Sequence, residues 1–409
     1  GGGGHFKELK VADPGVRVVV AGCLAEQDKD KMARLAPHVD GVFGTKELAE
    51  LGDALASWGP EFEATEFTEE RALLLPMGGH ADGVTDAFSH LRAFVTVQRG
   101  CSYYCSFCIV PHVRGRFDHR PTADVVAEVA ARLADGAREI MLVGQTVNAW
   151  KDPLSGAGFG ELCRAVAALP GLERLSFISP HPKDFSETMI RDFAGIPQLN
   201  PRVHLPLQSG SDPILRRMNR KYTRAQFEEK VALIHDYLPG WAITTDIIVG
   251  FPGETDDDFE ATMELVNRDL FSNAYTFVYS IRRGTPAARW EQVAPEVASA
   301  RYKRLLDAQN ASNRRYHDRM IGSTVRALVQ GESRKDPSRL AAKTVRNVTV
   351  IAPKPPDYDT ASYAREPWLD VRVETAHVWG TMGTIVGRAA RYADAGRAVE
   401  RPTIDLLAL

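Results

Sequence analysis

The chain has 409 residues, of which 44% are hydrophobic and 25% are charged, and its formal net charge is −3. This length exceeds one ordinary domain and the composition is that of a globular protein, so two or three domains are expected. No run of about 18 apolar residues occurs, which argues against a membrane span. The small net charge gives no overall attraction to nucleic acid, so any such partner would bind local basic patches.

Residues 1–65 predict a small α/β segment that opens with four glycines, which suggest a flexible end and not a signal peptide. Two strands cannot close a sheet, so we expect the start of this domain to be missing. Residues 66–90 are predicted to be a linker. The elements expected before it are a buried strand at 16–21, a helix over 24–35, a strand at 39–43 and a helix over 45–57 with Thr45 as its N-cap.

The stretch 91–320 alternates strands and helices, which predicts a parallel sheet with right-handed crossovers. Strands are expected at 93–98, 139–144, 174–179, 202–207, 242–249 and 274–280. Helices are expected at 122–135, 159–168, 184–193, 211–218, 224–236 and 256–269, with a long polar helix over 295–320. Six strands are fewer than the eight of a full barrel, so we expect an open, partial (βα)₆ barrel.

Residues 322–387 change to short strands separated by turn-forming residues, which predicts a small β-barrel or sandwich. These strands are expected at 325–329, 348–351, 368–374 and 383–386. The tail over 388–409 shows no periodicity.

Three of the five cysteines, Cys101, Cys105 and Cys108, fall within eight residues directly after the first strand of the alternation. A disulfide is disfavoured because the chain shows no secretory signal. Structural zinc normally takes four ligands in paired knuckles, and the sequence has no second knuckle. Three thiolates suit an iron–sulfur cluster with one iron that the protein does not ligate. Zinc or chance clustering is the alternative.

Polar residues also follow the ends of four further predicted strands, where barrels built of βα units carry their chemistry. The stretches are 144–148, 179–182, 204–211 and 244–255. Turns with helix caps are the structural alternative, and Thr255 with Asp258 fits a capping box. We select four strand-end residues as candidate contacts to a ligand: Gln145, His181, Gln208 and Asp246.

The C-x₃-C-x₂-C spacing resembles the signature of radical S-adenosylmethionine (SAM) enzymes. Together with 114–121, 143–148, 204–211, 217–223 and 245–255, the chain looks like the methylthiotransferases from about residue 6 to 386, and 144–148 is most similar to the branch acting on tRNA. The resemblance implies a [4Fe–4S] cluster on Cys101, Cys105 and Cys108 whose open iron binds SAM and cleaves it to a 5′-deoxyadenosyl radical. That radical would take hydrogen from adenine C2 of N6-isopentenyladenosine next to the anticodon, sulfur would be inserted, and a second SAM would supply the methyl group.

Two alternatives belong to the same enzyme class, namely methylthiolation of threonylcarbamoyl-adenosine in tRNA or of a ribosomal protein. An alternative from another class is an RNA-binding protein whose cysteine loop is only structural. Phe107, between two of the cysteines, could bind the adenine of SAM or cover the cluster.

Cys23 lies in Ala-Gly-Cys-Leu-Ala-Glu, which resembles the third cysteine motif of the family's N-terminal domain. The resemblance implies an auxiliary [4Fe–4S] cluster connected with sulfur delivery. The two earlier cysteines of that motif set are absent from this sequence, in agreement with the missing first strands. A lone thiol is otherwise most often a buried small hydrophobe, as we expect for Cys163 inside its helix.

The C-terminal β module looks like the TRAM domain with which the family binds RNA. Its basic residues and a second basic group after the 204–211 stretch are predicted to grip phosphates, with binding that weakens steeply with salt. These residues are Arg334, Lys335, Lys343 and Arg346, and Arg216, Arg217, Arg220 and Lys221. The target adenosine would have to leave its stack. Implied partners are the tRNA anticodon arm, an electron donor protein and a sulfur donor, and a cytoplasmic monomer is expected.

Overall fold

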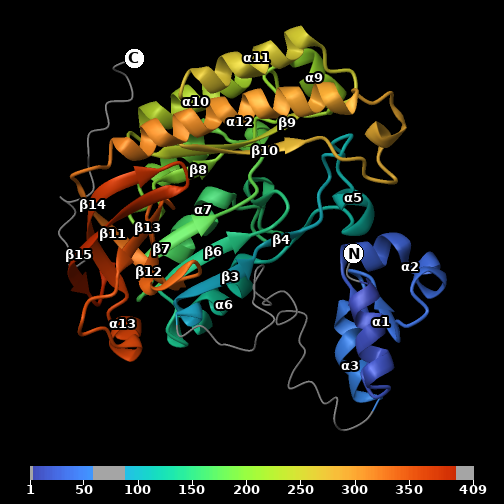
Figure 1. Ribbon diagram of the computed structural model, residues 1–409, viewed down its shortest axis with the longest axis horizontal. Coiled ribbons are helices and arrows are strands. Elements are labelled where there is room, and N and C mark those ends of the chain that lie inside the picture. The colour runs from blue at the N-terminus through green and yellow to red at the C-terminus, as the bar shows by residue number, and fades with distance from the viewer. Residues whose placement is uncertain (1–2, 59–87, 393–409) are drawn as a thin grey trace. The chain divides into compact units, whose positions relative to one another are not determined.

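The computed structural model describes residues 3–58 and 88–392 (Figure 1). The chain divides into two compact units. The first unit comprises Gly1–Gly83, Arg99–Tyr104 and Cys108–Asp118, and the second comprises Val84–Gln98, Cys105–Phe107 and His119–Leu409. The predicted linker and tail lie mostly outside the described residues. Within those residues, no helix is both long enough and apolar enough to cross a membrane.

The first unit contains the expected strand–helix–strand order, because its two strands pair in parallel with Val19 opposite Gly41. A helix that was not predicted contains Lys10. The side chain of Lys10 lies 2.5 Å from Asp40, which directly precedes the second strand. The predicted cap at Thr45 is wrong, because its hydroxyl donates to a carbonyl oxygen elsewhere and the next helical turn begins at Leu48. The elements are α1 (Gly3–Ala12), β1 (Val19–Ala21), α2 (Cys23–Leu35), β2 (Gly41–Phe43), η1 (Leu48–Glu50), α3 (Leu51–Ala56) and α5 (Val110–Val113).

The second unit contains all six predicted parallel strands in two three-stranded sheets, with strand orders β3-β6-β7 and β8-β9-β10. An isolated parallel bridge joins Leu175 to Leu199, just before β8. Strand neighbours therefore follow chain order within each sheet. The strands are β3 (Arg92–Thr96), β6 (Glu139–Val143), β7 (Arg174–Phe177), β8 (Arg202–His204), β9 (Ala242–Val249) and β10 (Asn273–Val278), and two short ones are β4 (Gln98–Arg99) and β5 (Asp118–His119).

The seven predicted helices of this unit are present, with ends set by polar caps. Ser211, Thr223 and Thr255 each accept a backbone N–H in the first turn of the helix that follows. The α8 helix begins at Glu187, later than predicted, because a separate turn at 182–184 precedes its cap Ser186. The helices are α6 (Thr122–Ala134), α7 (Phe159–Ala167), α8 (Glu187–Ala194), α9 (Asp212–Arg217), α10 (Arg224–Tyr237), α11 (Asp256–Asn267) and α12 (Pro295–Asp318), with single turns η3 (Ser89–Leu91), η4 (Val147–Ala149), η5 (Pro182–Asp184) and η6 (Pro286–Arg289).

Apolar side chains on one face of each sheet pack against these helices. Ile247, Val249 and Ala274 form one cluster with Phe259 of α11 and Leu305 of α12, and Figure 1 shows α11 and α12 along β9 and β10. Cys163 is fully buried in α7, as predicted for a core residue. The helices thus cover one face of each sheet, and the other face of the β8-β9-β10 sheet carries the polar side chains of His204, Thr244 and Asp246.

A buried ion network lies at the N-terminal ends of the strands. Glu139 of β6 pairs with Arg92 of β3 at 2.9 Å and with Arg174 of β7 at 3.5 Å. Burial alone would raise the pKa of Glu139, but the charges of Arg174 and Arg92 outweigh it and hold the pKa below its ordinary value. Arg174 also donates to the backbone carbonyl oxygens of Lys343 and Thr344, each at 3.2 Å. The network therefore fixes the C-terminal module to the sheets.

The C-terminal module is a closed barrel of five strands in the order β11-β12-β13-β15-β14. All neighbouring pairs are antiparallel except β13 with β15. A strand and a short helix in it were not predicted, β12 (Asp336–Thr344) and α13 (Thr360–Arg365). The other strands are β11 (Thr324–Ser333), β13 (Thr349–Pro353), β14 (Trp368–His377) and β15 (Gly380–Ala389).

Candidate functional site

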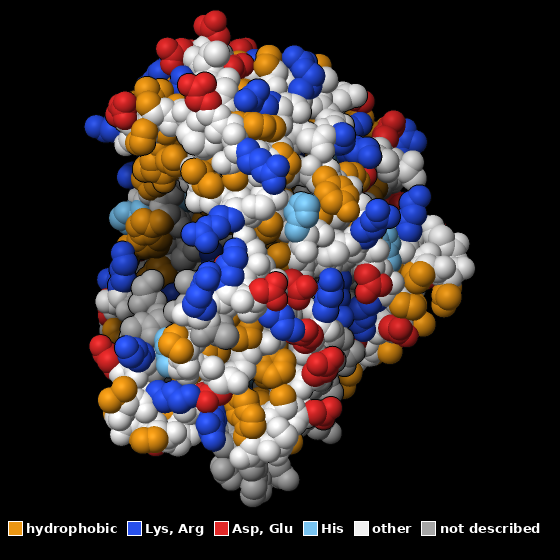
Figure 2. Space-filling view, turned by 90° about the vertical axis from the view of Figure 1, so that its right-hand side faces the viewer, with side chains coloured by type: hydrophobic (Ala, Val, Ile, Leu, Met, Phe, Trp, Pro, Cys, Tyr) orange, Lys and Arg blue, Asp and Glu red, His pale blue; other side chains and the backbone are white. Residues whose placement is uncertain are grey.

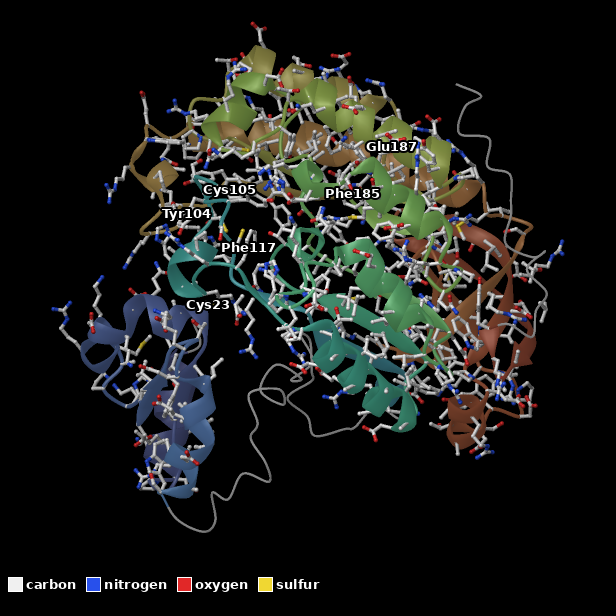
Figure 3. All side chains as sticks on the ribbon, turned by 180° about the vertical axis from the view of Figure 1, so that it is seen from behind. Cys23, Tyr104, Cys105, Phe117, Phe185 and Glu187 are labelled. Carbon is white, nitrogen blue, oxygen red and sulfur yellow. The ribbon has the colours of Figure 1, made fainter. Side chains whose placement is uncertain are left out.

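The first unit holds Cys101 and Cys108 in a loop with a tightly constrained backbone. Gly100 has φ +68°, and a Cβ atom there would lie 2.0 Å from the carbonyl oxygen of Arg116, so only glycine fits. The backbone N–H of Cys101 donates to the carbonyl oxygen of Gly115 at 3.1 Å. Tyr104, labelled in Figure 3, is a second left-handed residue, with φ 50°. Two such turns on either side of Cys101 define the path of the loop.

Cys23 stands at the start of α2 in the same unit, directly after Gly22, whose φ is +98°. The Nε–H of Arg114 donates to the Cys23 sulfur at 3.2 Å. Cys23 is labelled in Figure 3 and is partly exposed. The thiol is therefore not the fully buried small hydrophobe that a lone cysteine usually is.

In the second unit, Cys105 is 8% exposed and lies in a segment fixed by its neighbour Ser106 (Figure 3). The Ser106 N–H donates to the carbonyl oxygen of Met218 at 3.0 Å, and its own carbonyl accepts from the N–H of Ala287 at 2.9 Å. Both contacts involve backbone atoms, so they hold the main chain at Cys105 whatever its side chain binds.

Arg220 directs its guanidinium toward the middle cysteine. Its Nη1 lies 3.5 Å from the Cys105 sulfur, its Nε donates to the Tyr222 hydroxyl at 3.2 Å, and its Nη2 donates to the Pro206 carbonyl oxygen at 3.3 Å. The guanidinium lies 5.3 Å from the Tyr222 ring centroid, and Arg220 is only 5% exposed. This differs from the expected contact with RNA, because the head group is buried inside the protein.

His181 is buried, and its ring lies edge-on to Tyr222 with the centroids 5.6 Å apart. Burial, with a smaller effect of the Arg220 charge, lowers the pKa of His181 to about 2, so its imidazole is neutral. Asn148 holds the His181 backbone by donating to its carbonyl oxygen at 2.9 Å and accepting its N–H at 2.7 Å. Asn148 belongs to the 144–148 stretch but was not among the predicted ligand contacts. Its place three residues after the selected Gln145 at a strand end was the available signal.

Two selected glutamines present buried amide oxygens. Gln208 has φ 67°, accepts the N–H of Ile248 and donates its own N–H to the Asp246 carbonyl oxygen. Among the described residues, neither Oε1 of Gln208 nor Oε1 of Gln145 has a hydrogen-bond partner. Buried acceptors normally have a donor. The two oxygens can therefore accept hydrogen bonds from a bound ligand.

The polar face of the β8-β9-β10 sheet carries the fourth selected residue. The Asp246 carboxylate lies 3.2 Å from Nε2 of His204, whose Nδ1 lies 3.1 Å from the Thr244 hydroxyl. The His204 ring contacts the Tyr275 ring at 5.9 Å, and Tyr275 is 43% exposed. Strand register places Phe277, which is 50% exposed, two residues farther along the same face of β10. Acid, imidazole and exposed aromatic rings thus share one face.

Phe107 packs within the protein. Its ring meets Phe251 edge-on at 6.3 Å and contacts an apolar cluster that contains Ile214, Met218 and Ala287. Phe107 thus contacts other apolar side chains of the second unit, and both of its roles, covering the cluster or binding the adenine of SAM, stay predictions.

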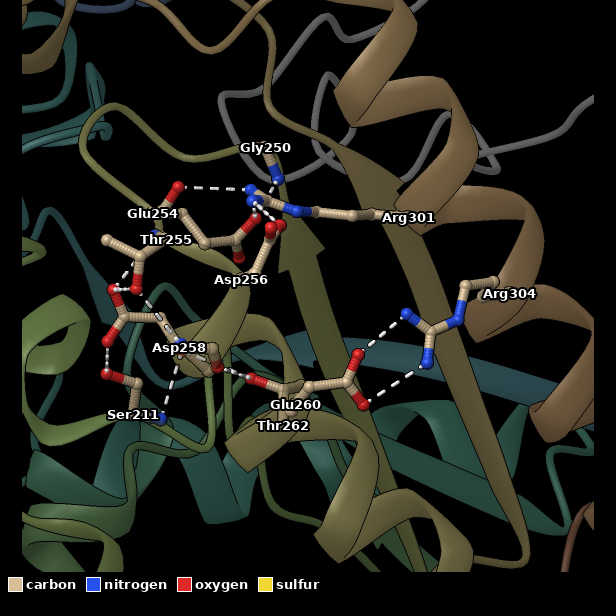
Figure 4. Close-up of polar contacts among 11 residues, drawn as sticks. Ser211, Gly250, Glu254, Thr255, Asp256, Asp258, Glu260, Thr262, Arg301 and Arg304 are labelled. Atoms are coloured by element: carbon tan, nitrogen blue, oxygen red, sulfur yellow. Dashed lines mark hydrogen bonds and ion pairs between the residues drawn. The ribbon is translucent and has the colours of Figure 1, made fainter.

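The loop between β9 and α11 is held by ion pairs from α12 (Figure 4). Arg301 donates to Glu254 at 2.8 Å and to Asp256 at 2.7 Å, and Glu254 accepts the N–H of Gly250. Burial raises the pKa of Glu254 above its ordinary value. The predicted capping box of Thr255 with Asp258 is confirmed, and Asp258 also accepts the Ser211 hydroxyl. The loops after β8 and β9 are thereby joined.

The basic residues selected for RNA fall into two structural groups. Arg216, Arg217 and Lys221 are exposed, as are Arg334 and Lys335 at the tip of the β11–β12 hairpin. Figure 2 shows Lys and Arg side chains interspersed with Asp and Glu over the face drawn there. On the face drawn there, the basic side chains therefore do not form one continuous patch.

Lys343 and Arg346 face other parts of the second unit. The Lys343 ammonium donates to the Thr349 hydroxyl at 2.7 Å, and Arg346 donates to the Gly240 carbonyl oxygen at 3.0 Å. Burial, followed by the charges of nearby arginines, lowers the pKa of Lys343 to about 8. These internal contacts differ from the expected phosphate contacts.

Within the described residues, no three or more His, Cys, Asp or Glu side chains are placed so that they could hold a single metal ion. A [4Fe–4S] cluster makes a different demand, because each cysteine ligates a different iron and the sulfurs need not meet at one point.

Comparison with known proteins gives consistent matches. Residues 95–266 match the Radical SAM superfamily. A tRNA-2-methylthio-N(6)-dimethylallyladenosine synthase of Desulfitobacterium hafniense is 38% identical over 354 residues, which cover 86% of this chain and 78% of that protein. A protein of the same name from Anaeromyxobacter dehalogenans is 41% identical over 355 residues, which cover 85% and 75%.

A solved structure shares the fold. The radical S-adenosylmethionine methyltransferase TsrM of Kitasatospora setae, with tryptophan and a SAM analog bound, superimposes with a TM-score of 0.52 at 19% identity. The match covers 70% of this chain and 59% of that one. At this identity the likeness concerns the fold alone.

Proposed function

This chain belongs to the family of tRNA-2-methylthio-N(6)-dimethylallyladenosine synthases, which are radical SAM enzymes, and on this premise we propose that it adds the methylthio group at C2 of N6-isopentenyladenosine next to the tRNA anticodon. The observation that carries the proposal is the identity of about 40% to such enzymes over 85% of the chain. In this proposal the two parallel sheets form the partial (βα)₆ barrel of radical SAM enzymes, and the C-terminal barrel is a TRAM-like module.

Cys101, Cys105 and Cys108 hold a [4Fe–4S] cluster in this proposal, and the fixed backbone at Gly100 and Ser106 supports their placement. Bound there and reduced, the cluster supplies the electron that cleaves SAM into methionine and a 5′-deoxyadenosyl radical. The protein's own contribution next to Cys105 is to exclude water. Phe107 and its apolar cluster do this, because water has no partner among their side chains.

The strand-end residues bind and orient SAM and the adenosine. The amide oxygens of Gln145 and Gln208 accept N–H or O–H groups of the ligands, since neither has a partner among the described residues. His181, held neutral and fixed by Asn148, supplies a ring edge. Asp246 carries the charge on the face where the aromatic rings are exposed, so it suits a donor group of the substrate.

The target adenosine leaves its stack and its base meets the exposed rings of Tyr275 and Phe277 on β10. The flat ring of Tyr275 suits the base, and the apolar ring of Phe277 suits the isopentenyl group. Arg216, Arg217 and Lys221 bind phosphates of the anticodon arm, and Arg334 and Lys335 bind two more distant phosphates.

Cys23 is proposed as one ligand of an auxiliary [4Fe–4S] cluster connected with sulfur delivery. Its partial exposure and its contact with Arg114 support this role, because thiolates that bind clusters receive N–H donors. An electron donor protein, a sulfur donor and a place in the cytoplasm complete the proposal.

Anaerobic reconstitution with iron and sulfide tests the proposal. The wild-type chain should bind a cluster, form 5′-deoxyadenosine from SAM under reductant, and retain tRNA. Cys105→Ala should lose SAM cleavage and keep tRNA binding, whereas Cys163→Ala, a cysteine buried in α7, should keep both. Near-zero iron in the wild type, with tRNA still bound, would favour the non-catalytic alternative. Digested tRNA from cells with and without the gene should differ in 2-methylthio-N6-isopentenyladenosine; a difference in a threonylcarbamoyl-adenosine derivative instead would reassign the substrate.

A further inference from the structure

Arg220 is a buried cation whose neighbours are almost all neutral. Arginine keeps its charge in proteins, and a buried charge is normally compensated by an opposite one. Among the described residues no carboxylate forms an ion pair with it; its N–H groups contact the Tyr222 hydroxyl, the Pro206 carbonyl oxygen and the Cys105 sulfur. The hydroxyl and the carbonyl are neutral. The sulfur, once it ligates iron as a thiolate, is the one member of this set that carries negative charge.

We propose that Arg220 raises the reduction potential of the cluster bound by Cys105, through its positive charge and its N–H···S contact. The inference rests on the proposed function, since it requires the cluster on the three cysteines. Reduction takes one electron from an external low-potential reductant, and no bond or proton is exchanged with Arg220. The cluster gains negative charge in that step, so a fixed positive charge in a dry environment stabilises the reduced form more than the oxidised form.

The position of Arg220 is set independently of the cluster. Tyr222 donates to the carbonyl oxygens of Pro206 and Leu207 at 2.9 and 2.7 Å, and its ring lies against the guanidinium. Arg220 is thus held in place before the cluster is reduced, and its positive charge is already next to Cys105 when the electron arrives. It acts on the reaction only through the cluster. Such preorganisation is what makes a charge effective at a reacting group.

Arg114 provides a matched control. It is also an arginine that donates to a cysteine sulfur, at 3.2 Å, but its acceptor is Cys23, outside the C-x₃-C-x₂-C motif. Removing Arg114 therefore deletes the same kind of contact without altering Cys105.

The test is a potentiometric titration of the reconstituted chain with dithionite and redox mediators. The reduced cluster is followed by its electron paramagnetic resonance signal, and the signal of the cluster on Cys105 is identified by its change when SAM is added. We expect Arg220→Met to make one-electron reduction about tenfold less favourable, a shift of about 59 mV to more negative potential. Arg220→Lys keeps a positive charge but loses the planar guanidinium with its several N–H donors, so it should shift the potential in the same direction by less. Arg114→Met should leave this potential at the wild-type value, because it keeps the contact of Arg220 with Cys105.

The outcomes separate the two proposals. A wild-type chain that binds no cluster overturns both. A wild-type cluster whose potential is unchanged in Arg220→Met overturns only the role of Arg220, and a lowered melting temperature with unchanged potential would make Arg220 a structural donor. An equal shift in Arg114→Met would overturn it too, because loss of an arginine–sulfur contact outside the motif would then have the same effect. Where Arg220→Met does not fold, Arg220→Gln, which keeps an N–H donor but carries no charge, decides, and an unchanged potential there overturns the inference.

Discussion

Replacing Glu139 by Gln probes the ion network at the base of the sheets. Glu139 and Arg174 have side chains that are each 1% exposed, so the change removes a negative charge from beside a buried guanidinium. Breaking a buried pair from one side costs about 3–5 kcal/mol. Arg174 keeps its bonds to Asn200 and to the C-terminal barrel, which favours the lower end, about 3 kcal/mol. For a unit of this size that is a fall in Tm of roughly 6–12 °C.

The assay is thermal and urea unfolding followed by circular dichroism and tryptophan fluorescence. Trp368 lies 5.3 Å from the Arg174 guanidinium and reports on the network directly. The matched control is Glu260→Gln, which breaks the pair with Arg304 on the surface, where both side chains are more than half exposed. That change should cost less than about 1 kcal/mol. Equal losses in the two variants would refute the reasoning that burial makes the Glu139 pair critical.

The pH dependence gives an independent test. The folded protein holds the pKa of Glu139 below its ordinary value, so the stabilisation is present above the unfolded pKa of about 4.3. It is lost as the pH falls through the folded pKa. The difference in stability between the wild type and Glu139→Gln should therefore shrink as the solution is acidified, and a difference that stays constant would contradict the assigned cause.

Four further outcomes are expected. Gly100→Ala should lower reconstituted iron by more than half because its Cβ meets a backbone oxygen at 2.0 Å, whereas Gly156→Ala, with φ +77° but open space, should keep its iron; equal iron in both would count against the loop constraint. Asn148→Ala removes two hydrogen bonds to His181 and should reduce kcat/KM for 5′-deoxyadenosine formation about thirtyfold, at about 1 kcal/mol per bond; unchanged kinetics would deny it a positioning role. The double variant Arg334→Ala, Lys335→Ala should reduce the slope of log K for tRNA against log salt by about 1.5, and an unchanged slope would exclude phosphate contacts at the hairpin tip. Lys343 has a folded pKa of about 8, below the unfolded value of about 10.4, so stability should rise between these pH values, and Lys343→Met should lack that rise.

The periodicity of apolar residues in the sequence was sufficient to predict the strands and helices of the two parallel sheets. The six strands and seven helices of the second unit were predictable because each buries an apolar run or stripe, as Val95 and Ile247 illustrate. The strand β12 was missed since it begins with Asp336 and Pro337 and buries few large side chains. Its existence depends on hydrogen bonds to β11 and β13, which are distant contacts that no local pattern records.

The residues of the candidate site also fall into those that the sequence could identify and those that it could not. The cysteines and strand-end residues could be selected from spacing and position in the chain. The roles of Arg220, Lys343 and Arg346 could not, because an arginine that is buried and one that is solvated look alike in sequence. What distinguishes them is the set of acceptors that the fold brings within reach, such as the Gly240 carbonyl oxygen for Arg346. Likewise Thr45 looked like a helix cap but bonds to a residue 68 positions away.

The β11–β12 hairpin fixes the distance between its base and its tip. Its base is fixed at Lys343 and Thr344, whose carbonyl oxygens accept from Arg174. Its tip carries Arg334 and Lys335 at the other end of β12. Eight steps of a strand at about 3.3 Å each set roughly 26 Å between base and tip. Because this span is a hydrogen-bonded strand, it holds the two basic side chains of the tip at that separation from the base, and adding two residues to each strand would displace them by about 7 Å.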